Sequence, residues 1–283
     1  MIEVKYISSN KKEYNLIGDK MRPTDGSFHK YEWEPSVIAR LIGETVTRFA
    51  KKAKTYPLTL TVRGSLDERK ILIDELTDAF ETDIINVQPG RIYFGEWYID
   101  CYIKAKTTGI SDTWNNWTKL DLSVYCPYPE WIREMTRSFP QISSEGQQDE
   151  TYLDYEHDYD YDYTMPYGGD VIWNVAHFAP CEFLMTIFGP AVDPRIVING
   201  HPYQVYTTLD TNEYLKIDSR ENKVIKYLAN GIQQDIYDLR AKQESVFDPI
   251  TPGNISVVWP GEFGFDLTLF LERSEPRWKT QNS

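Results

Sequence analysis

The sequence has no long hydrophobic run. None of its apolar stretches approaches the ~20 residues that a membrane-spanning helix needs. Its first residues, MIEVKYISSNKKEY, also lack the pattern of a secretory signal, in which a positively charged segment precedes an apolar core. We therefore expect a protein without a membrane span that is made and assembled in the cytoplasm.

Cysteine and histidine are scarce. The three thiols, Cys101, Cys126 and Cys181, form no C-x-x-C pair, so we predict free thiols that are buried or half-buried. No histidine has the Glu-x-x-His or His-x-x-x-His spacing of a zinc site. The four are His29, His157, His177 and His201. His201 directly follows Asn199-Gly200. Its place in a turn explains this histidine without a catalytic or metal-binding role.

The motifs of common enzyme classes are missing. There is no G-x-S-x-G elbow, no G-x-x-x-x-G-K-[ST] loop, and no G-x-G-x-x-G between a strand and a helix. Acidic residues are so numerous that choosing two as a glycosidase pair would be arbitrary, since that mechanism requires a defined carboxylate separation in a cleft. We therefore expect no catalytic residues, no cofactor and no metal site.

Positive charge is in deficit. The chain has 30 Lys and Arg against 43 Asp and Glu, a net charge of −13. This balance opposes use of the whole surface for nucleic acid, because neutralising phosphates requires clustered cations. Aromatic residues are plentiful instead, with 20 Tyr and 8 Trp, which suits both β-structure and protein interfaces.

Residues 1–137 are predicted to form an α+β domain. A short strand at Ile2–Tyr6 is followed by a polar arm to residue 42, which we expect to be poorly ordered unless a neighbour holds it. Two strand candidates lie between Glu44 and Arg63. Ser65 and Glu68 then form a capping box that starts a helix from about Leu66 to Phe80. The apolar stripe of this helix comprises Leu72, Leu76, Ala79 and Phe80.

Two further strands complete this domain. Residues 96–106 alternate strictly, which predicts one buried face and one wet or partner-facing face. The buried set is Trp97, Ile99, Cys101, Ile103 and Ala105, and the open set is Tyr98, Asp100, Tyr102, Lys104 and Lys106. Residues 117–124 form the next strand, which Cys126-Pro127 ends because proline cannot donate to a ladder.

Residues 138–169 are acidic and rich in Tyr, with no Lys or Arg. We interpret them as a solvated connector between domains, with an edge strand as the alternative. Asp158-x-Asp160-x-Asp162 resembles the start of a calcium loop, but Tyr163 stands where Gly is required and Gly169 where a bidentate Glu is required. Loose cation binding by this run remains the alternative.

Residues 170–283 are predicted to form an antiparallel β-sandwich. Asn199-Gly200 and Asn230-Gly231 each lie between apolar runs, as in tight hairpins, and Arg220–Asn222 forms a third turn. Strands are expected at 171–178 and 182–188. The last strand, 263–272, places Phe265, Leu267, Leu269 and Leu271 on one face.

An ordered set of short motifs resembles the distal tail proteins of long-tailed, non-contractile bacteriophages, the siphovirus tail component family. The set comprises Gly189-Pro190, Pro194–Gly200, Glu213–Ser219, Asn230-Gly231 and Phe247–Asn254, and it covers about a third of the chain. The run R-G-x-L-x-E-R at Arg63–Arg69 is also similar to the family. The resemblance implies a ring-forming N-terminal belt domain and a C-terminal galectin-like sandwich.

The function that the resemblance implies is structural. A homo-oligomeric ring, a hexamer in the family, would end the tail tube at the virion tail tip, after assembly in a bacterial host. Its partners would be the tail tube protein on one face and tail-associated or receptor-binding proteins on the other. The alternative is a carbohydrate-binding module that contacts cell-surface glycan, with Trp173 or Trp259 as candidates for stacking on sugar.

The acidic connector gives the first testable prediction. Because the EF-hand positions are not met, we expect titration calorimetry at millimolar Ca²⁺ to show no heat of binding. A measurable heat, or calcium-dependent assembly, would instead support cation binding by residues 138–169.

Overall fold

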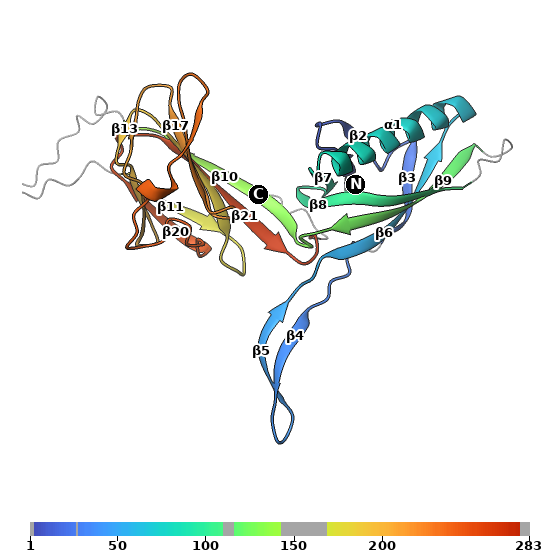
Figure 1. The fold of residues 1–283 in the computed structure, drawn as a ribbon, viewed down its shortest axis with the longest axis horizontal. Helices are drawn as coiled ribbons and strands as arrows, with labels where there is room; N and C mark the ends of the chain where they lie inside the picture. Colours follow the sequence, from blue (N-terminus) through green and yellow to red (C-terminus); the bar gives the residue numbers. More distant parts are fainter. Residues whose placement is uncertain (1–2, 27, 110–115, 143–168, 278–283) are drawn as a thin grey trace, which may run out of the picture. The chain divides into compact units, whose positions relative to one another are not determined.

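The computed structural model describes residues 3–26, 28–109, 116–142 and 169–277 (Figure 1). Within these ranges the protein is mainly β, with a single α-helix, as predicted. The chain divides into unit 1, Met1–Arg133 with Glu272–Ser283, and unit 2, Glu134–Leu271. The acidic part of the predicted connector, with Asp158, Asp160 and Asp162, lies outside the described residues. No helix among the described residues is long and apolar enough to cross a bilayer.

Unit 1 contains an antiparallel sheet of seven strands in the order β2-β1-β7-β8-β9-β6-β3. The strands are β1 Val4–Ile7, β2 Glu13–Asn15, β3 Met21–Gly26, β6 Lys54–Arg63, β7 Gly90–Phe94, β8 Trp97–Thr108 and β9 Trp117–Cys126. The arm meets the condition under which we expected it to be ordered, because neighbouring strands pair with β1, β2 and β3. Tyr6, Tyr14 and Met21 are buried, and this burial fixes the first three strands to the rest of the sheet.

Helix α1, Leu66–Ile85, packs on one face of this sheet. The capping box is confirmed: the Ser65 side chain accepts from the Glu68 amide, and the Glu68 carboxylate accepts from the Ser65 amide. The helix runs five residues beyond the predicted end. Leu76, Ala79 and Phe80 are buried as predicted, and Asp83 in the next turn is buried as well.

Asp83 fastens the end of the helix to the first strand. Its carboxylate accepts hydrogen bonds from the Tyr6 hydroxyl, from the Ser9 amide at 2.8 Å and from the Ser9 hydroxyl at 2.7 Å. A buried carboxylate is tolerable only when its oxygens are satisfied in this way. Burial raises the pKa of Tyr6 and the bond to Asp83 raises it further, so the phenol stays a donor at neutral pH.

Strand β8 follows the predicted alternation only in part. A bulge between Ile103 and Ala105 shifts its register against β9. As a result Ala105 is exposed, and the Lys106 ammonium lies on the helix side, where it contacts the Thr77 hydroxyl. The inward position of Ala105 and the outward position of Lys106 were therefore predicted wrongly.

The other face of β8 is also less open than predicted. Tyr98 is buried, and the Arg91 guanidinium lies 4.1 Å from the centre of its ring while donating to Asp100 at 2.9 Å. Lys104 remains exposed and Tyr102 half-buried. The surface of Tyr and Lys predicted for subunit contacts is thus reduced to the end of the strand.

Unit 2 is built from two sheets with aromatic rings between them. The larger has the order β19-β18-β17-β12-β21-β10, and the smaller β11-β20-β14-β15. The strands of the larger sheet are β10 Trp131–Phe139, β12 Glu182–Phe188, β17 Tyr214–Asp218, β18 Lys223–Tyr227, β19 Gln233–Asp235 and β21 Phe265–Arg273. Those of the smaller are β11 Gly169–Val175, β14 Arg195–Ile198, β15 His201–Gln204 and β20 Gly253–Trp259.

Short elements connect these sheets: β13 Ala191–Val192 pairs with β16 Thr208–Leu209, and a 3-10 turn spans Tyr237–Leu239. The rings of Phe139, Trp259 and Phe265 contact one another across the two sheets, with centroids 4.6–5.6 Å apart. The four inward residues predicted for the last strand are all buried. The chain passes from one unit to the other within β10 and within β21.

The Asn-Gly turns lie where they were predicted. Asn199 and Gly200 have φ of 52° and 83° and join β14 to β15 in a two-residue hairpin. In the second turn only Gly231 has positive φ, and the Leu228 carbonyl accepts from the Gly231 amide at 2.9 Å. This geometry is that of a longer hairpin loop, with the glycine in the left-handed position.

Gly90 gives a prediction for the helix–sheet contact. A Cβ at this position would lie 2.5 Å from both the Asp83 carboxylate and the Tyr6 hydroxyl. We expect Gly90→Ala to lower the free energy of unfolding by about 1–3 kcal/mol, because the contact has no room. Gly18→Ala is the matched control, since a Cβ there meets nothing within 4 Å. Equal urea-unfolding midpoints for the two variants would contradict this account.

Candidate interaction surface

The thiols offer no reactive nucleophile. Cys101, Cys126 and Cys181 are all buried, as predicted. Burial raises the pKa of Cys101 well above its ordinary value and that of Cys126 to about 12. Both thiols are therefore protonated at neutral pH, and a protonated buried thiol is a poor nucleophile and a poor metal ligand.

Within the described ranges, no three His, Cys, Asp or Glu side chains come together as metal ligands. His201 opens β15, and its Nε2 lies 2.8 Å from the Ser245 carbonyl oxygen. His157 lies outside the described residues. The geometry around His201 is that of a histidine that holds a loop in place.

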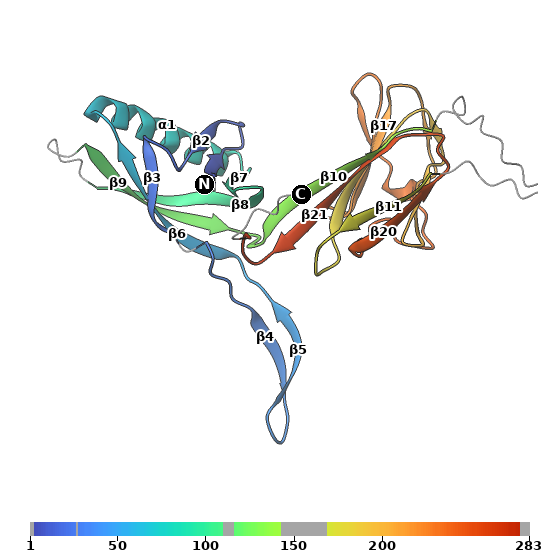
Figure 2. The same cartoon turned by 180° about the vertical axis from the view of Figure 1, so that it is seen from behind.

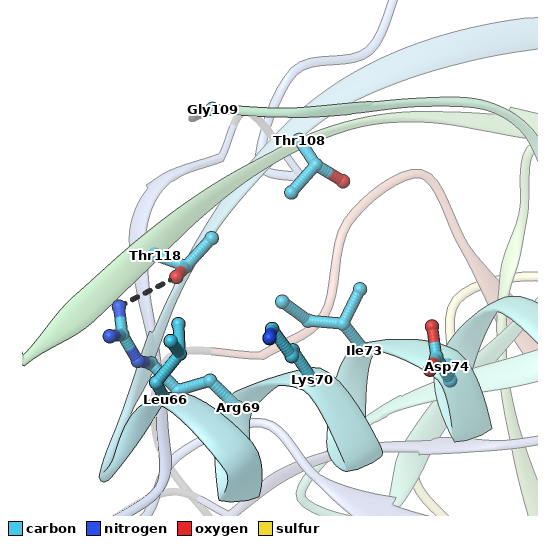
Figure 3. Close-up of a pocket in the computed structure, with 8 residues that line it drawn as sticks. All are labelled: Leu66, Arg69, Lys70, Ile73, Asp74, Thr108, Gly109 and Thr118. Atoms are coloured by element: carbon cyan, nitrogen blue, oxygen red, sulfur yellow. Dashed lines mark hydrogen bonds between the residues drawn. The ribbon is translucent and has the colours of Figure 1, made fainter. Parts of the chain in front are cut away.

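A small pocket lies between the start of α1, the end of β8 and the start of β9 (Figure 3). Its volume is about 150 Å³, below the roughly 300–1,000 Å³ of typical small-molecule sites. Arg69 is 2 % exposed and donates to the Thr118 hydroxyl at 2.8 Å, which joins the helix to β9. Lys70 and Asp74 also line the pocket. The arrangement explains the R-G-x-L-x-E-R run as a strand-to-helix junction.

The two tryptophans considered for sugar stacking are core residues. Trp173 is 8 % and Trp259 4 % exposed, and the Trp259 indole donates to the Phe263 carbonyl at 3.1 Å. Neither ring face is available to a ligand. A sequence cannot separate such residues from surface aromatics, because both occupy alternating strand positions.

Tyr237, which is 39 % exposed, contacts two neighbouring side chains. Phe247 stacks on it at 5.9 Å, and the Arg240 guanidinium lies 3.6 Å from its ring centre. These two contacts reduce the area of the Tyr237 ring that is open to a sugar.

The most exposed feature of unit 1 is a two-stranded hairpin, β4 Glu34–Ala39 and β5 Glu44–Ala50. Figures 1 and 2 show it extending away from the sheet of its own unit. Among the described residues, β4 and β5 pair only with each other. Their turn is closed by the Arg40 amide donating to the Gly43 carbonyl at 3.0 Å, and Gly43 takes φ of 74°.

Apolar side chains cover this hairpin. Leu41 is 101 % and Ile42 90 % exposed at the turn, where polar residues are the rule. Further exposed apolar residues follow both strands: Val37, Ile38, Val46 and Phe49. Exposed apolar side chains gathered on one element mark a protein interaction site. The sequence holds one signal for it, the apolar pair directly before Gly43, and we did not predict it.

The base of the hairpin is held firmly by Lys51. Its ammonium contacts the Glu130 carboxylate, donates to the Ser274 hydroxyl at 2.6 Å and lies 4.2 Å from the ring centre of Trp33. The side chains of Lys51 and Glu130 are only 8 % and 14 % exposed. A charge pair shielded from water is stronger than an exposed one, so the hairpin leaves unit 1 from a fixed root.

A groove lies on the same unit. Its volume is about 380 Å³, and most of its lining is apolar. The apolar residues are Val4, Leu16, Ile17, Pro23, Phe28, Leu58 and Phe94, with Thr24, Asp25, Gly26 and His29 completing the wall. Burial lowers the pKa of His29, which favours the neutral imidazole. The groove is suited to an apolar occupant.

Comparison with known proteins identifies the fold. No family model matches the sequence, and no curated protein sequence matches it. The structure is similar to the Dit protein of phage SPP1, a paradigm of the hub adsorption apparatus in phages that infect Gram-positive bacteria. The TM-score is 0.61 at 14% identity, over 95% of this chain and 99% of that one.

Chains of the phage p2 baseplate in its activated conformation, with Ca or with Sr, match equally well. Each has a TM-score of 0.61 at 9% identity, over 98% of this chain and 100% of the other. The chain has the Dit fold.

The motifs that resembled distal tail proteins hold turns of this Dit fold. Asn199 bonds to the Thr251 carbonyl and the Ser256 amide, each at 3.0 Å. Ser219 accepts from the Phe183 amide at 2.7 Å, and Asp218 accepts from two amides of the following turn. These residues therefore hold turns of the fold.

The hairpin root gives the next prediction. We expect Lys51→Ala to speed amide hydrogen exchange across residues 34–50 and to lower stability by about 1.5–3 kcal/mol, because Glu130 loses its charged donor. Lys52→Ala is the control, since Lys52 pairs with Glu34 in solvent and exposed pairs contribute ~0–1 kcal/mol. Equal exchange in both variants would show that Lys51 does not fix the root.

Proposed function

We propose that this protein is a structural virion component, the distal tail or baseplate hub protein at the tip of a phage tail. The supporting observation is the match to the Dit fold over nearly the whole chain, in both units. The ordered motifs of the C-terminal half point to the same family. On this proposal the protein acts by its shape and its contacts, without catalysis.

The proposed mechanism is the closure of a ring. A ring forms when each subunit offers two different, complementary surfaces and the rotation between them completes a circle. We assign these surfaces to the belt region, residues 1–137, and six copies would follow the family. The domain at 170–283, proposed to be galectin-like, would stand at the periphery.

The proposed partners follow from that place in the tail. One face of the ring would receive the tail tube protein, and the other the tail-associated or receptor-binding proteins. The carbohydrate-binding alternative loses its two candidate residues, because Trp173 and Trp259 are both buried. A glycan array with the purified protein tests it directly.

Ring formation gives a prediction in solution. We expect the purified full-length protein to sediment as a closed oligomer and to show rings in negative-stain electron micrographs. The reason is that an exposed apolar hairpin is costly to leave in water. A protein that stays monomeric at high concentration in sedimentation, and shows no rings, would contradict the proposed function.

A further inference from the structure

We infer that the tip of the β4–β5 hairpin inserts into the apolar groove of the next copy of this chain and so forms the repeated contact of the ring. This inference rests on the proposed function and adds its contact residues. The tip is Leu41-Ile42. The groove is the cavity whose wall includes Ile17, Phe28 and Phe94.

The tip does not occupy the groove of its own chain. Leu41 and Ile42 are almost fully exposed, so neither side chain contacts a wall of any cavity in the same molecule. The root, by contrast, is fixed through Lys51. An apolar hairpin whose root is fixed and whose tip is exposed can contact another molecule.

The dimensions fit such a contact. Strand β5 has seven residues, and at about 3.3 Å per residue it carries the tip roughly 20 Å from the root. The groove of about 380 Å³ lies in the size range of cavities that enclose apolar groups. Two aliphatic side chains at a turn are a compact occupant for it.

The chemistry of the two surfaces is complementary. The groove is mostly apolar, and Asp25 is the charged residue of its wall. At the tip, Arg40 precedes the apolar pair, and its guanidinium donates to the Thr45 hydroxyl on the opposite strand. Insertion would bring the Arg40 cation toward the Asp25 carboxylate.

A second copy is the occupant that best explains both features. Projection and groove are different surfaces of one chain, so the contact between copies is head-to-tail, and head-to-tail contacts generate rings or filaments. A separate tail component would use only one of the two surfaces. It would leave either the tip or the groove without a role.

The first experiment uses two complementary variants. The tip variant carries Leu41→Asp and Ile42→Asp, and the groove variant carries Ile17→Asp. In sedimentation velocity we expect each alone to be monomeric, with association weakened more than tenfold. Mixed together they should form dimers that grow no further, because the pair retains one intact tip and one intact groove.

A matched control separates this effect from general loss of surface hydrophobicity. Val192→Asp removes an apolar residue that is 71 % exposed in unit 2, and we expect it to leave the rings intact. Circular dichroism checks that the groove variant folds. If the groove variant does not fold, the tip variant still tests the contact. Its substituted side chains lie in solvent, so the substitutions do not disturb the core.

Cross-linking tests the direction of the contact. Since Cys101, Cys126 and Cys181 are buried, Ile42→Cys and Ile17→Cys introduce the accessible thiols. Under oxidation we expect a covalent dimer when the two variants are mixed. A tip-to-tip dimer from Ile42→Cys alone would overturn the inference, because it requires a symmetric contact.

The outcomes distinguish this inference from the proposed function. Rings of wild-type protein that persist in the tip variant would overturn the tip-in-groove contact and leave the hub function standing. Loss of binding to another tail component with intact rings would identify that component as the occupant and also overturn the inference. Monomeric wild-type protein would overturn both.

Discussion

A two-stranded hairpin cannot bury its own apolar side chains, and this constraint governs the interpretation of the whole molecule. In unit 1 the core is complete without β4 and β5, since strands β1–β3 and β6–β9 pack under α1. The hairpin adds six exposed apolar residues and contributes no buried core residue. Isolated hairpins are marginally stable in water, so cover for this one must come from outside the chain.

The rest of unit 1 holds the root of that hairpin in place. Asp83 joins the end of α1 to β1, and Arg69 joins its start to β9, so the helix is tied to the sheet at both ends. Lys51 and Glu130 then fix the root of the hairpin through a shielded ion pair. In the proposed ring, rigid positioning matters because a ring closes only if every subunit repeats the same rotation.

Local signals in the sequence predicted much of the fold. The Ser65 and Glu68 pair located the start of α1, and Asn199-Gly200 located a hairpin, because each position has a backbone requirement that few residues meet. The end of α1 was missed, since it depends on Asp83, an acid whose burial is satisfied by Tyr6 and Ser9 from distant positions. The bulge in β8 was missed because it arises from pairing with β9.

The interaction surface could not be predicted in the same way. Leu41-Ile42 at the hairpin tip and Trp173 in the core are equally apolar, and only the structure shows that the first are in solvent and the second is not. The resemblance to distal tail proteins gave the expected class of function, whereas the groove is assembled from segments as distant as Val4 and Phe94.

Electron cryo-microscopy of the assembled full-length protein tests the central claim most directly. The account predicts a ring in which every β4–β5 hairpin crosses to its neighbour and buries Leu41 and Ile42. A ring in which the hairpins stand free in solvent, with subunits joined through other surfaces, would contradict it.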